Sequence, residues 1–129
     1  MAKTLLIVYH SMTGGTRQMA QAVHDGAAQD SAVAVRLLHA SQAHAADVLA
    51  ADALVFATPE NLAAMSGQLK DFFDRCYYDV LDQVNGRPYA ALVCAGSDGQ
   101  GAVRQIERIA TGWRLRAVAP ALVVCTHAQ

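Results

Sequence analysis

The sequence predicts an α/β protein in which helices pack on both faces of a parallel β-sheet. Two observations carry this prediction. Short apolar runs of strand length alternate along the chain with segments whose apolar residues recur at helical spacing. Several of the runs are apolar throughout, which is typical of strands buried on both faces of a parallel sheet. The connections between such strands are expected to be right-handed crossovers.

Length and composition predict one globular domain over residues 1–129. The chain has 129 residues, of which 53% are hydrophobic and 16% are charged. This composition excludes a disordered chain and a coiled coil. The formal net charge is -1, so no basic surface dominates and nucleic acid is not an expected partner.

Five strands are predicted, and two of them carry features of sheet edges. Arg36 interrupts the apolar pattern of the second strand, and Pro120 lies in the fifth, where it cannot donate a hydrogen bond to a neighbour. Edge positions for these two strands give the order 2-1-3-4-5, with a ligand expected where the order switches between strands 1 and 3. The predicted strands are Thr4–Tyr9, Ala32–Leu38, Ala53–Ala57, Tyr89–Ala95 and Val118–Cys125.

Four helices are predicted between these strands. The clearest follows Ser66, a candidate N-cap, and its apolar stripe is expected to face the core. Ser41 is the candidate N-cap of a short helix over residues 43–50, and Pro59 is expected to end the third strand. The stripes are Met19, Ala20, Val23 and Ala27 in the first helix, Leu69, Phe72, Phe73, Cys76 and Tyr77 in the third, and Val103, Ile106, Ala110 and Trp113 in the fourth.

The cysteines and histidines indicate neither a metal site nor a disulfide framework. Cys76, Cys94 and Cys125 lie far apart in apolar stretches, and no C-x-x-C is present. The histidines show no metal-ligand spacing. The longest apolar run, Leu5–Tyr9, is far shorter than the roughly 20 residues that span a bilayer. The N-terminus has no secretory cleavage pattern, and a reducing cytoplasm is the expected location.

Ligands of such sheets bind outside the carboxyl ends of the strands, where the first of three distinctive loops lies. His10–Arg17 offers three hydroxyls and two glycines between a buried strand and a helix. Glycines let backbone N–H groups approach an anion, and a helix N-terminus favours negative charge, so the loop predicts a site for a phosphate monoester. It is neither a Walker A loop nor G-x-G-x-x-G, which argues against a nucleoside triphosphatase and the usual dinucleotide site. The alternative is a turn and helix cap without a ligand.

The second and third loops face the same predicted crevice. Thr58–Gly67 exposes an apolar stretch from Leu62 to Met65, which suits a flat, partly apolar ligand; the alternative is a helix entry packed on the core. Gly96–Gly101 has three glycines in six residues, which allow a close approach of backbone to ligand; the alternative is a plain turn capped by Asp98. A ligand in one crevice accounts for all three loops.

On these motifs the chain resembles flavodoxin-like FMN-binding proteins, and most closely their NAD(P)H-dependent FMN-reductase and quinone-reductase branch. Residues 11–16 match the family's S/T-x-T-G-x-T phosphate loop. Residues 58–75 are similar to the branch's segment T-P-x-x-x-x-x-M-S-G-x-x-K-D-F-x-D-R. The resemblance runs from Lys3 to about Cys125 and implies a flavodoxin-like three-layer sandwich.

The resemblance implies FMN as the cofactor. Its phosphate would be held by Ser11, Thr13 and Thr16 and by backbone N–H groups of residues 12–16, and its isoalloxazine would lie against residues 59–65. Residues 97–100 would line the other edge of the ring. The flavin would carry the redox chemistry, and no catalytic side chain is assigned. The predicted FMN-binding residues are Ser11, Met12, Thr13, Gly14, Gly15, Thr16, Pro59, Glu60, Asn61, Leu62, Met65, Ser97, Asp98, Gly99 and Gln100.

The implied function is an FMN-dependent oxidoreductase that takes a hydride from NAD(P)H and reduces a quinone, a free flavin or a similar acceptor. Residues 58–67 and 95–102 contain no Trp, Tyr or Phe, and the net charge is small. Both features favour a reductase over a flavodoxin-type electron-transfer protein, which stays the first alternative. The second alternative is a non-enzymatic flavodoxin-like interaction domain. The partner would be a small-molecule electron acceptor or a redox protein.

The sequence departs from the family pattern at its end. The family usually continues after the fifth strand into a fifth helix, whereas this chain ends at Gln129. Without that helix, part of one face of strands 3, 4 and 5 would be bare. A bare apolar face is an assembly surface, so the sequence predicts either a homo-oligomer or a natural chain that is longer.

Overall fold

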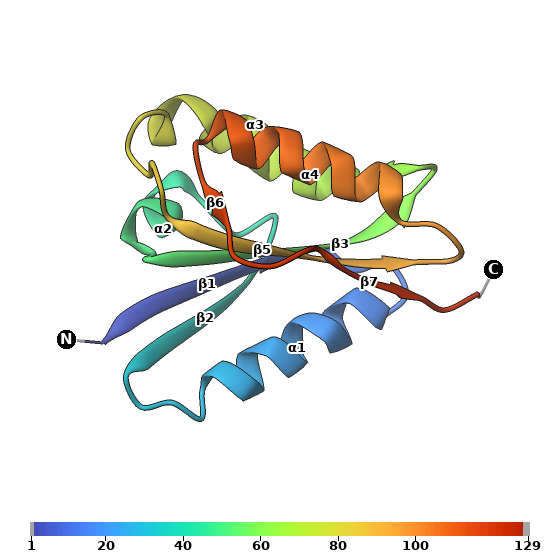
Figure 1. Ribbon diagram of the computed structural model, residues 1–129, viewed down its shortest axis with the longest axis horizontal. Helices are drawn as coiled ribbons and strands as arrows, with labels where there is room; N and C mark the ends of the chain where they lie inside the picture. Colours follow the sequence, from blue (N-terminus) through green and yellow to red (C-terminus); the bar gives the residue numbers. More distant parts are fainter. Residues whose placement is uncertain (1, 128–129) are drawn as a thin grey trace.

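The computed structural model describes residues 2–127, which form one β-sheet between two layers of helices (Figure 1). Helix α1 lies on one face of the sheet, and α2, α3 and α4 lie on the other. This is the predicted three-layer α/β arrangement. The helices are α1 (Gly15–Ala27), α2 (Ala45–Ala50), α3 (Gly67–Val80) and α4 (Gln100–Gly112). The strands are β1 (Lys3–Tyr9), β2 (Val33–His39), β3 (Ala53–Asn61), β4 (Ala64–Met65), β5 (Pro88–Ala95), β6 (Arg116–Ala117) and β7 (Leu122–Cys125).

The strand order confirms the prediction, with β5 as the predicted fourth strand. β1 pairs in parallel with β2 on one side and with β3 on the other, and β3 pairs in parallel with β5. β6 and β7 share the fifth position, because each pairs in parallel with β5. Residues 2–127 therefore contain seven strands rather than the expected five, since the fifth is divided and β4 is added.

The predicted fifth strand, Val118–Cys125, is wrong in its bounds. β6 covers Arg116–Ala117 and β7 covers Leu122–Cys125. Of the four residues between them, Val118 still donates its N–H to the Tyr89 carbonyl at 3.1 Å, and the chain then leaves the ladder until Leu122. Pro120 lies in this interruption. A proline has no N–H for a ladder hydrogen bond, so the edge of the sheet bows outward where Pro120 lies.

The third strand does not end at Pro59 as expected. β3 continues to Asn61 and folds back into β4, with Glu60 opposite Met65. The Ala57 carbonyl faces β1, because it accepts a hydrogen bond from the His10 N–H at 3.2 Å. Two residues later, Pro59 presents its missing N–H to the same side, where β1 has already ended. The proline therefore costs the sheet no hydrogen bond there.

The main core lies between the sheet and helices α2–α4. Phe56 of β3 is its centre, with ring centroids 4.9 Å from Phe73 and 6.2 Å from Trp113. The predicted stripe of α3 is buried here, apart from Tyr77, which is 36% exposed. A smaller cluster beneath α1 fills the opposite face around Ile7. Both faces of the central strands are therefore buried, as their unbroken apolar runs predict.

The two predicted N-caps have different outcomes. The Ser66 hydroxyl accepts a hydrogen bond from the Leu69 N–H at 3.3 Å and caps α3. Ser41 does not cap α2, which begins after His44 in a capping box with Asp47. The Ser41 N–H instead donates to His39 Nδ1 at 3.1 Å, so Ser41 belongs to a turn that follows β2.

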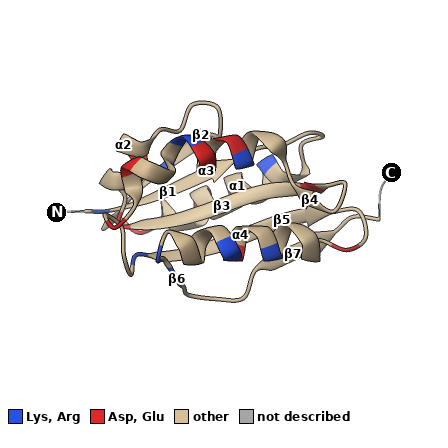
Figure 2. Ribbon diagram, turned by 90° about the horizontal axis from the view of Figure 1, so that it is seen from above, with Lys and Arg blue, Asp and Glu red and all other residues tan. Residues whose placement is uncertain are grey.

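The outer surface of α3 carries two ion pairs between residues four positions apart. Lys70 Nζ lies 2.6 Å from Asp74, and Arg75 Nε lies 2.8 Å from Asp71. Figure 2 shows acidic and basic positions side by side along this helix. Exposed pairs of this kind contribute only a few tenths of a kcal/mol each. This surface is therefore a solvated helix face and not a site of one charge.

The face predicted to be bare is exposed at β7. Leu122 is 55% and Val124 is 40% exposed, whereas the alternating Val123 and Cys125 pack against the main core. Helix α1 packs on the neighbouring strands, and no helix in residues 2–127 covers this face of β7 (Figure 1). In the same part of the chain, no helix combines the length and the apolarity that crossing a membrane requires.

Candidate functional site

A pocket of about 550 Å³ opens where β1, β3 and β5 end. It lies at the switch in strand order between β1 and β3, where the sequence predicts the ligand. The pocket brings together the first predicted loop and the β3–β4 hairpin. Its lining residues are Ser11, Met12, Thr13, Thr16, Pro59, Glu60, Asn61, Leu62, Cys94, Ala95, Gly96 and Thr126.

The first loop folds as a cradle at the N-terminus of α1. The Ser11 hydroxyl accepts hydrogen bonds from the Gly14 N–H at 3.1 Å and the Arg17 N–H at 3.3 Å. This leaves its own proton free to donate to a ligand. The first turn of α1 also carries N–H groups that no carbonyl within the helix can accept. Hydroxyls and N–H groups together form a donor set suited to a phosphate.

Two glycines of the cradle meet different requirements. Gly14 is the N-cap of α1 and has φ of +104°, a conformation that side-chain-bearing residues rarely adopt. Gly15 lies so close to β5 that an added Cβ would stand 2.8 Å from Cys94 Sγ. Neither glycine lines the pocket. Both allow the backbone of the loop to come close to it. The predicted Thr16 is buried, and Thr13 is exposed.

The β3–β4 hairpin forms the second wall through a strained turn. Its two central residues, Leu62 and Ala63, have φ of +52° and +65°. A left-handed conformation costs roughly 1–2 kcal/mol for each residue that has a Cβ. The turn also leaves Leu62 fully exposed, opposite Met12, which is 66% exposed. Two exposed apolar side chains, Met12 and Leu62, therefore flank the pocket. The backbone strain lies at the turn of the hairpin.

Glu60 does not offer its carboxylate to the pocket that it lines. One oxygen accepts the Gly99 N–H at 2.8 Å, and the other accepts the N–H groups of Gly101 at 3.0 Å and Ala102 at 3.3 Å. The carboxylate therefore occupies the anion site at the N-terminus of α4. In this way Glu60 fastens the hairpin to the third loop.

A second fastening comes from a residue that sequence reasoning missed. Gln105 Oε1 on α4 accepts a hydrogen bond from the Met65 N–H at 2.9 Å. Met65 itself is buried in the main core and does not line the pocket. No local pattern marks Gln105, because its partner lies 40 positions away.

The third loop is placed differently from the prediction. Ser97, Asp98, Gly99 and Gln100 do not line the pocket, which is closed on this side by Cys94, Ala95, Gly96 and Thr126. In the alternative of a plain turn, Asp98 would cap α4, but Gly99 is the N-cap and Glu60 supplies the carboxylate. The end of β5 therefore reaches the pocket before the loop turns away from it.

His10, at the end of β1, is buried beside the cradle. It is 7% exposed, and its Nδ1 has no hydrogen-bond partner among residues 2–127. Its ring packs edge-on against His39 at 5.4 Å. Burial, assisted by His39, lowers the pKa of His10 below its ordinary value of 6.5. The imidazole is therefore neutral at pH 7. Among residues 2–127, no three His, Cys, Asp or Glu side chains lie together so that they could hold a metal ion.

This lowered pKa predicts a pH-dependent stability. Below about pH 6.5 the unfolded chain binds a proton at His10 that the folded protein does not yet bind. The free energy of unfolding should then fall as the pH drops, by up to about 1.4 kcal/mol per pH unit from this group. Urea denaturation between pH 7.5 and 5 measures the slope. A His10→Gln variant should show a shallower slope than the parent protein, and equal slopes in the two proteins would contradict the assignment.

Comparisons with known proteins show the family of this chain. The sequence model of the family described as NADPH-dependent FMN reductase matches residues 38–129. A flavodoxin from Aquifex aeolicus is 35% identical over 97 residues, which are 75% of this chain and 52% of that protein. An NAD(P)H dehydrogenase (quinone) from Acidithiobacillus ferrooxidans is 31% identical over 91 residues, which are 55% of this chain and 46% of the relative. The chain thus spans about half the length of these two relatives.

Solved structures match the fold over almost the whole chain. A flavodoxin from the domain Archaea has a TM-score of 0.84 at 21% identity, over 95% of this chain and 82% of its own. A WrbA-like flavodoxin from Agrobacterium tumefaciens has a TM-score of 0.78 at 22% identity, over 99% of this chain and 86% of its own. These likenesses establish the flavodoxin-like fold.

Proposed function

Because the chain belongs to the NADPH-dependent FMN reductase family, we propose that it binds FMN in the pocket at the ends of β1, β3 and β5 and acts as an oxidoreductase. In this proposal it takes a hydride from NAD(P)H and passes it to a quinone, a free flavin or a similar acceptor. The observation that carries the proposal is the donor cradle at the N-terminus of α1, which opens into a pocket with apolar flanks.

The residues present fit FMN. A volume of about 550 Å³ is within the range of small-molecule sites. Ser11, Thr13 and Thr16 would hold the phosphate together with the first N–H groups of α1. Only one of the two nearby helix N-termini is available for it, because Glu60 already occupies that of α4. The phosphate is thereby directed to α1.

The remaining walls suit the isoalloxazine. Met12, Pro59, Asn61 and Leu62 offer mostly apolar surface on one side. The backbone of residues 94–96 closes the other side, and residues 97–100 stand next to it as a further part of the proposed site. Bound FMN would supply the capacity to accept and release a hydride. The chain's own contribution is to bind and orient the ring and to leave access for its reaction partners.

The pocket lining favours a reductase over an electron shuttle. None of its lining residues is Trp, Tyr or Phe, so no aromatic side chain would cover the flavin ring. An uncovered ring is accessible to a nicotinamide and to a small-molecule acceptor. The alternatives are a flavodoxin-type electron-transfer protein that serves a redox partner and a non-enzymatic flavodoxin-like interaction domain. Oxidation of NADH or NADPH by the FMN-loaded protein with a quinone present tests the reductase; no oxidation of either would contradict it.

A reducing, cytoplasmic location and a homo-oligomeric state are part of the same proposal. All three cysteines are free, as is expected where thiols stay reduced. The exposed apolar residues of β7 support assembly of copies. Sedimentation velocity of the FMN-loaded protein tests the oligomeric state.

FMN binding itself is tested by titration with FMN and with riboflavin, which lacks the phosphate. We expect the protein to bind FMN much more tightly than riboflavin, because the cradle has no counterpart for the missing group. Replacement of Thr13 by alanine should weaken FMN binding by about 1.5–3 kcal/mol, or more than tenfold, since a hydroxyl donor to a charged group is removed. Flavin fluorescence measures both effects.

The Thr13→Ala variant has a clear control. Thr13 is exposed, so its removal should leave the fold intact. Ser31→Ala, in an exposed turn remote from the pocket, should not change the affinity. Riboflavin affinity should be the same in the Thr13→Ala variant and the parent protein. Unchanged FMN affinity in the variant would show that the cradle does not hold the phosphate.

A further inference from the structure

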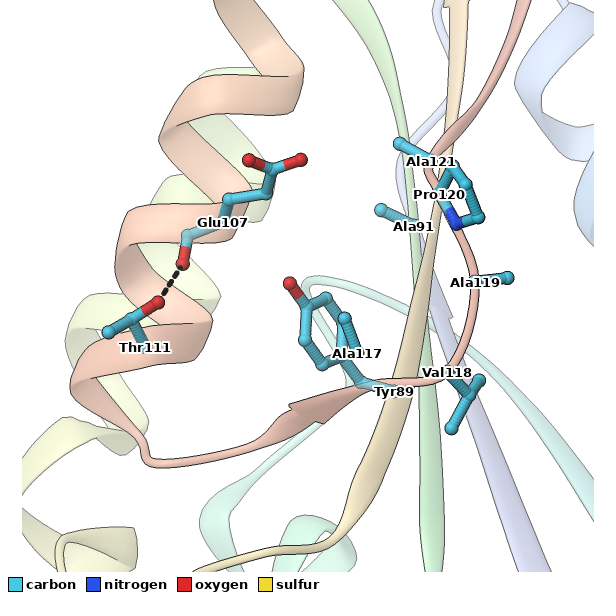
Figure 3. A pocket seen from close by; sticks show the side chains of 9 residues that line it. All are labelled: Tyr89, Ala91, Glu107, Thr111, Ala117, Val118, Ala119, Pro120 and Ala121. Carbon is cyan, nitrogen blue, oxygen red and sulfur yellow. Dashed lines mark hydrogen bonds between the residues drawn. The ribbon is translucent and has the colours of Figure 1, made fainter.

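A second cavity lies on the α4 side of the sheet, near the amino end of β5 (Figure 3). Its volume is about 550 Å³. Tyr89 and Ala91 of β5 form its floor, and α4 forms one wall with Glu107 and Thr111. The opposite wall is the edge segment 117–121, which contains β6 and the interruption before β7. No residue is shared with the pocket proposed for FMN.

The cavity arises from a mismatch in strand register. Tyr89 pairs with Ala117, and Leu92 pairs with Leu122. Between these two pairs, β5 has two residues and the edge segment has four. The extra length bows away from the sheet, and the side chains around the gap, four of them alanine, do not fill it. The space is thus a consequence of the backbone.

Two oxygen-bearing side chains point into this space. Figure 3 shows the Glu107 carboxylate and the Tyr89 hydroxyl turned toward the gap between α4 and the edge segment. Tyr89 as a whole residue is only 6% exposed. Its hydroxyl forms no side-chain hydrogen bond within residues 2–127, but it is not one of the buried unpartnered polar atoms there, so it is open to the cavity. Glu107 forms no ion pair in the same residues. A tyrosine whose ring is packed in the core and whose hydroxyl opens into a cavity can offer that hydroxyl to a ligand in a fixed position.

The chemistry of the lining selects the charge of that ligand. The Glu107 carboxylate can only accept hydrogen bonds. The Thr111 hydroxyl already donates to the Glu107 carbonyl at 2.8 Å, so it too offers lone pairs. Arg104 and Arg108 line a neighbouring depression, which shares Glu107 and Thr111 with this cavity, and neither arginine lines the cavity itself. The lining therefore favours a donor-rich cation and disfavours an anion.

We propose that this cavity binds a small organic ammonium ion with a compact apolar body. The ammonium group would donate to the Glu107 carboxylate and the Tyr89 hydroxyl, with the Tyr89 ring close enough to contribute a cation–π interaction. The apolar body would lie on Ala91 and on the edge segment around Pro120. This inference does not depend on the proposed redox function, because the two sites are separate.

Benzylammonium is a suitable probe, with benzyl alcohol as its neutral analogue and benzoate as the anion. Each is titrated into the full-length, FMN-supplemented protein at constant ionic strength, and ¹H–¹⁵N chemical shifts report the affinity and the location. We expect benzylammonium to shift the amide signals of residues 89–91, 107–111, 117–119 and 121. It should bind at least tenfold more tightly than the alcohol, since it gains a charge-assisted hydrogen bond.

Variants separate the two polar groups. Glu107→Gln should weaken benzylammonium at least tenfold, and Tyr89→Phe should weaken it several-fold while keeping the ring that packs in the core. Asp79→Asn removes the same charge from an exposed position on α3 that does not line the cavity, and it should leave the affinity unchanged. The proposal is overturned if benzyl alcohol or benzoate binds as tightly, if Glu107→Gln has no effect, or if the shifts map elsewhere.

Discussion

Replacement of Gly101 by alanine is expected to destabilise the protein by about 1–3 kcal/mol and to weaken FMN binding at least tenfold. An added Cβ would collide with the carbonyl oxygen of Ala63 and lie 2.8 Å from its carbonyl carbon. Both atoms belong to backbone and cannot rotate away. The hairpin must therefore shift from α4, which is a case of overpacking. Because the hairpin forms one wall of the pocket, its displacement should weaken the contacts with FMN and so lower the affinity.

A second glycine of the same helix provides the control. Gly112, at the end of α4, has nothing within 4 Å of an added Cβ. Alanine is favoured over glycine in a helix by up to about 1 kcal/mol, so Gly112→Ala should leave stability unchanged or raise it. Urea denaturation and FMN titration of both variants measure the contrast. If the two substitutions have the same effect, the contact between α4 and the hairpin is not the constraint that the structure indicates.

The phosphate cradle could be predicted from sequence because all its requirements are local. Strand β1, the glycines and the start of α1 are consecutive in the chain, so their order alone places the hydroxyls of Ser11 and Thr13 at a helix N-terminus. The central strands could also be predicted from sequence, because a strand that is buried on both faces appears as an unbroken apolar run. The structure confirms the strands, the helices and the order of the sheet, whereas the binding of a phosphate by the loop stays a prediction.

The sequence predicted the residues of the opposite wall, Pro59–Leu62, but not its conformation, because contacts between distant residues fix that conformation. The turn at Leu62 and Ala63 carries no glycine or asparagine to signal left-handed backbone. It exists because Glu60 and Met65 on its two sides are each held by α4, about 40 residues later. The same contacts hold Gly99 on Glu60, so residues 97–100 border the pocket without lining it. Sequence spacing can suggest that two loops meet, but it does not reveal which backbone groups they share.

The Glu60 carboxylate illustrates how such a contact becomes a functional requirement. It accepts three backbone N–H groups from the first turn of α4 and joins the two loops that border the pocket. Glu60→Ala should lower the free energy of unfolding by about 2–3 kcal/mol, because charged hydrogen bonds and a helix cap are lost together. FMN affinity should fall as well, since the strained hairpin would no longer be held in place. Glu60→Gln, which keeps one acceptor oxygen, should be intermediate.

Glu107 allows the effect of charge to be separated from the effect of position. It lies on the exposed surface of α4 and accepts no backbone N–H at the helix terminus. Glu107→Ala should change neither FMN affinity nor stability by more than about 0.5 kcal/mol. Hydrogen exchange adds a readout that does not depend on FMN. The Gly99, Gly101 and Ala102 amides should lose protection in Glu60→Ala and keep it in Glu107→Ala. Retained protection in Glu60→Ala would mean that water replaces the carboxylate and that the hairpin is held by its other contacts.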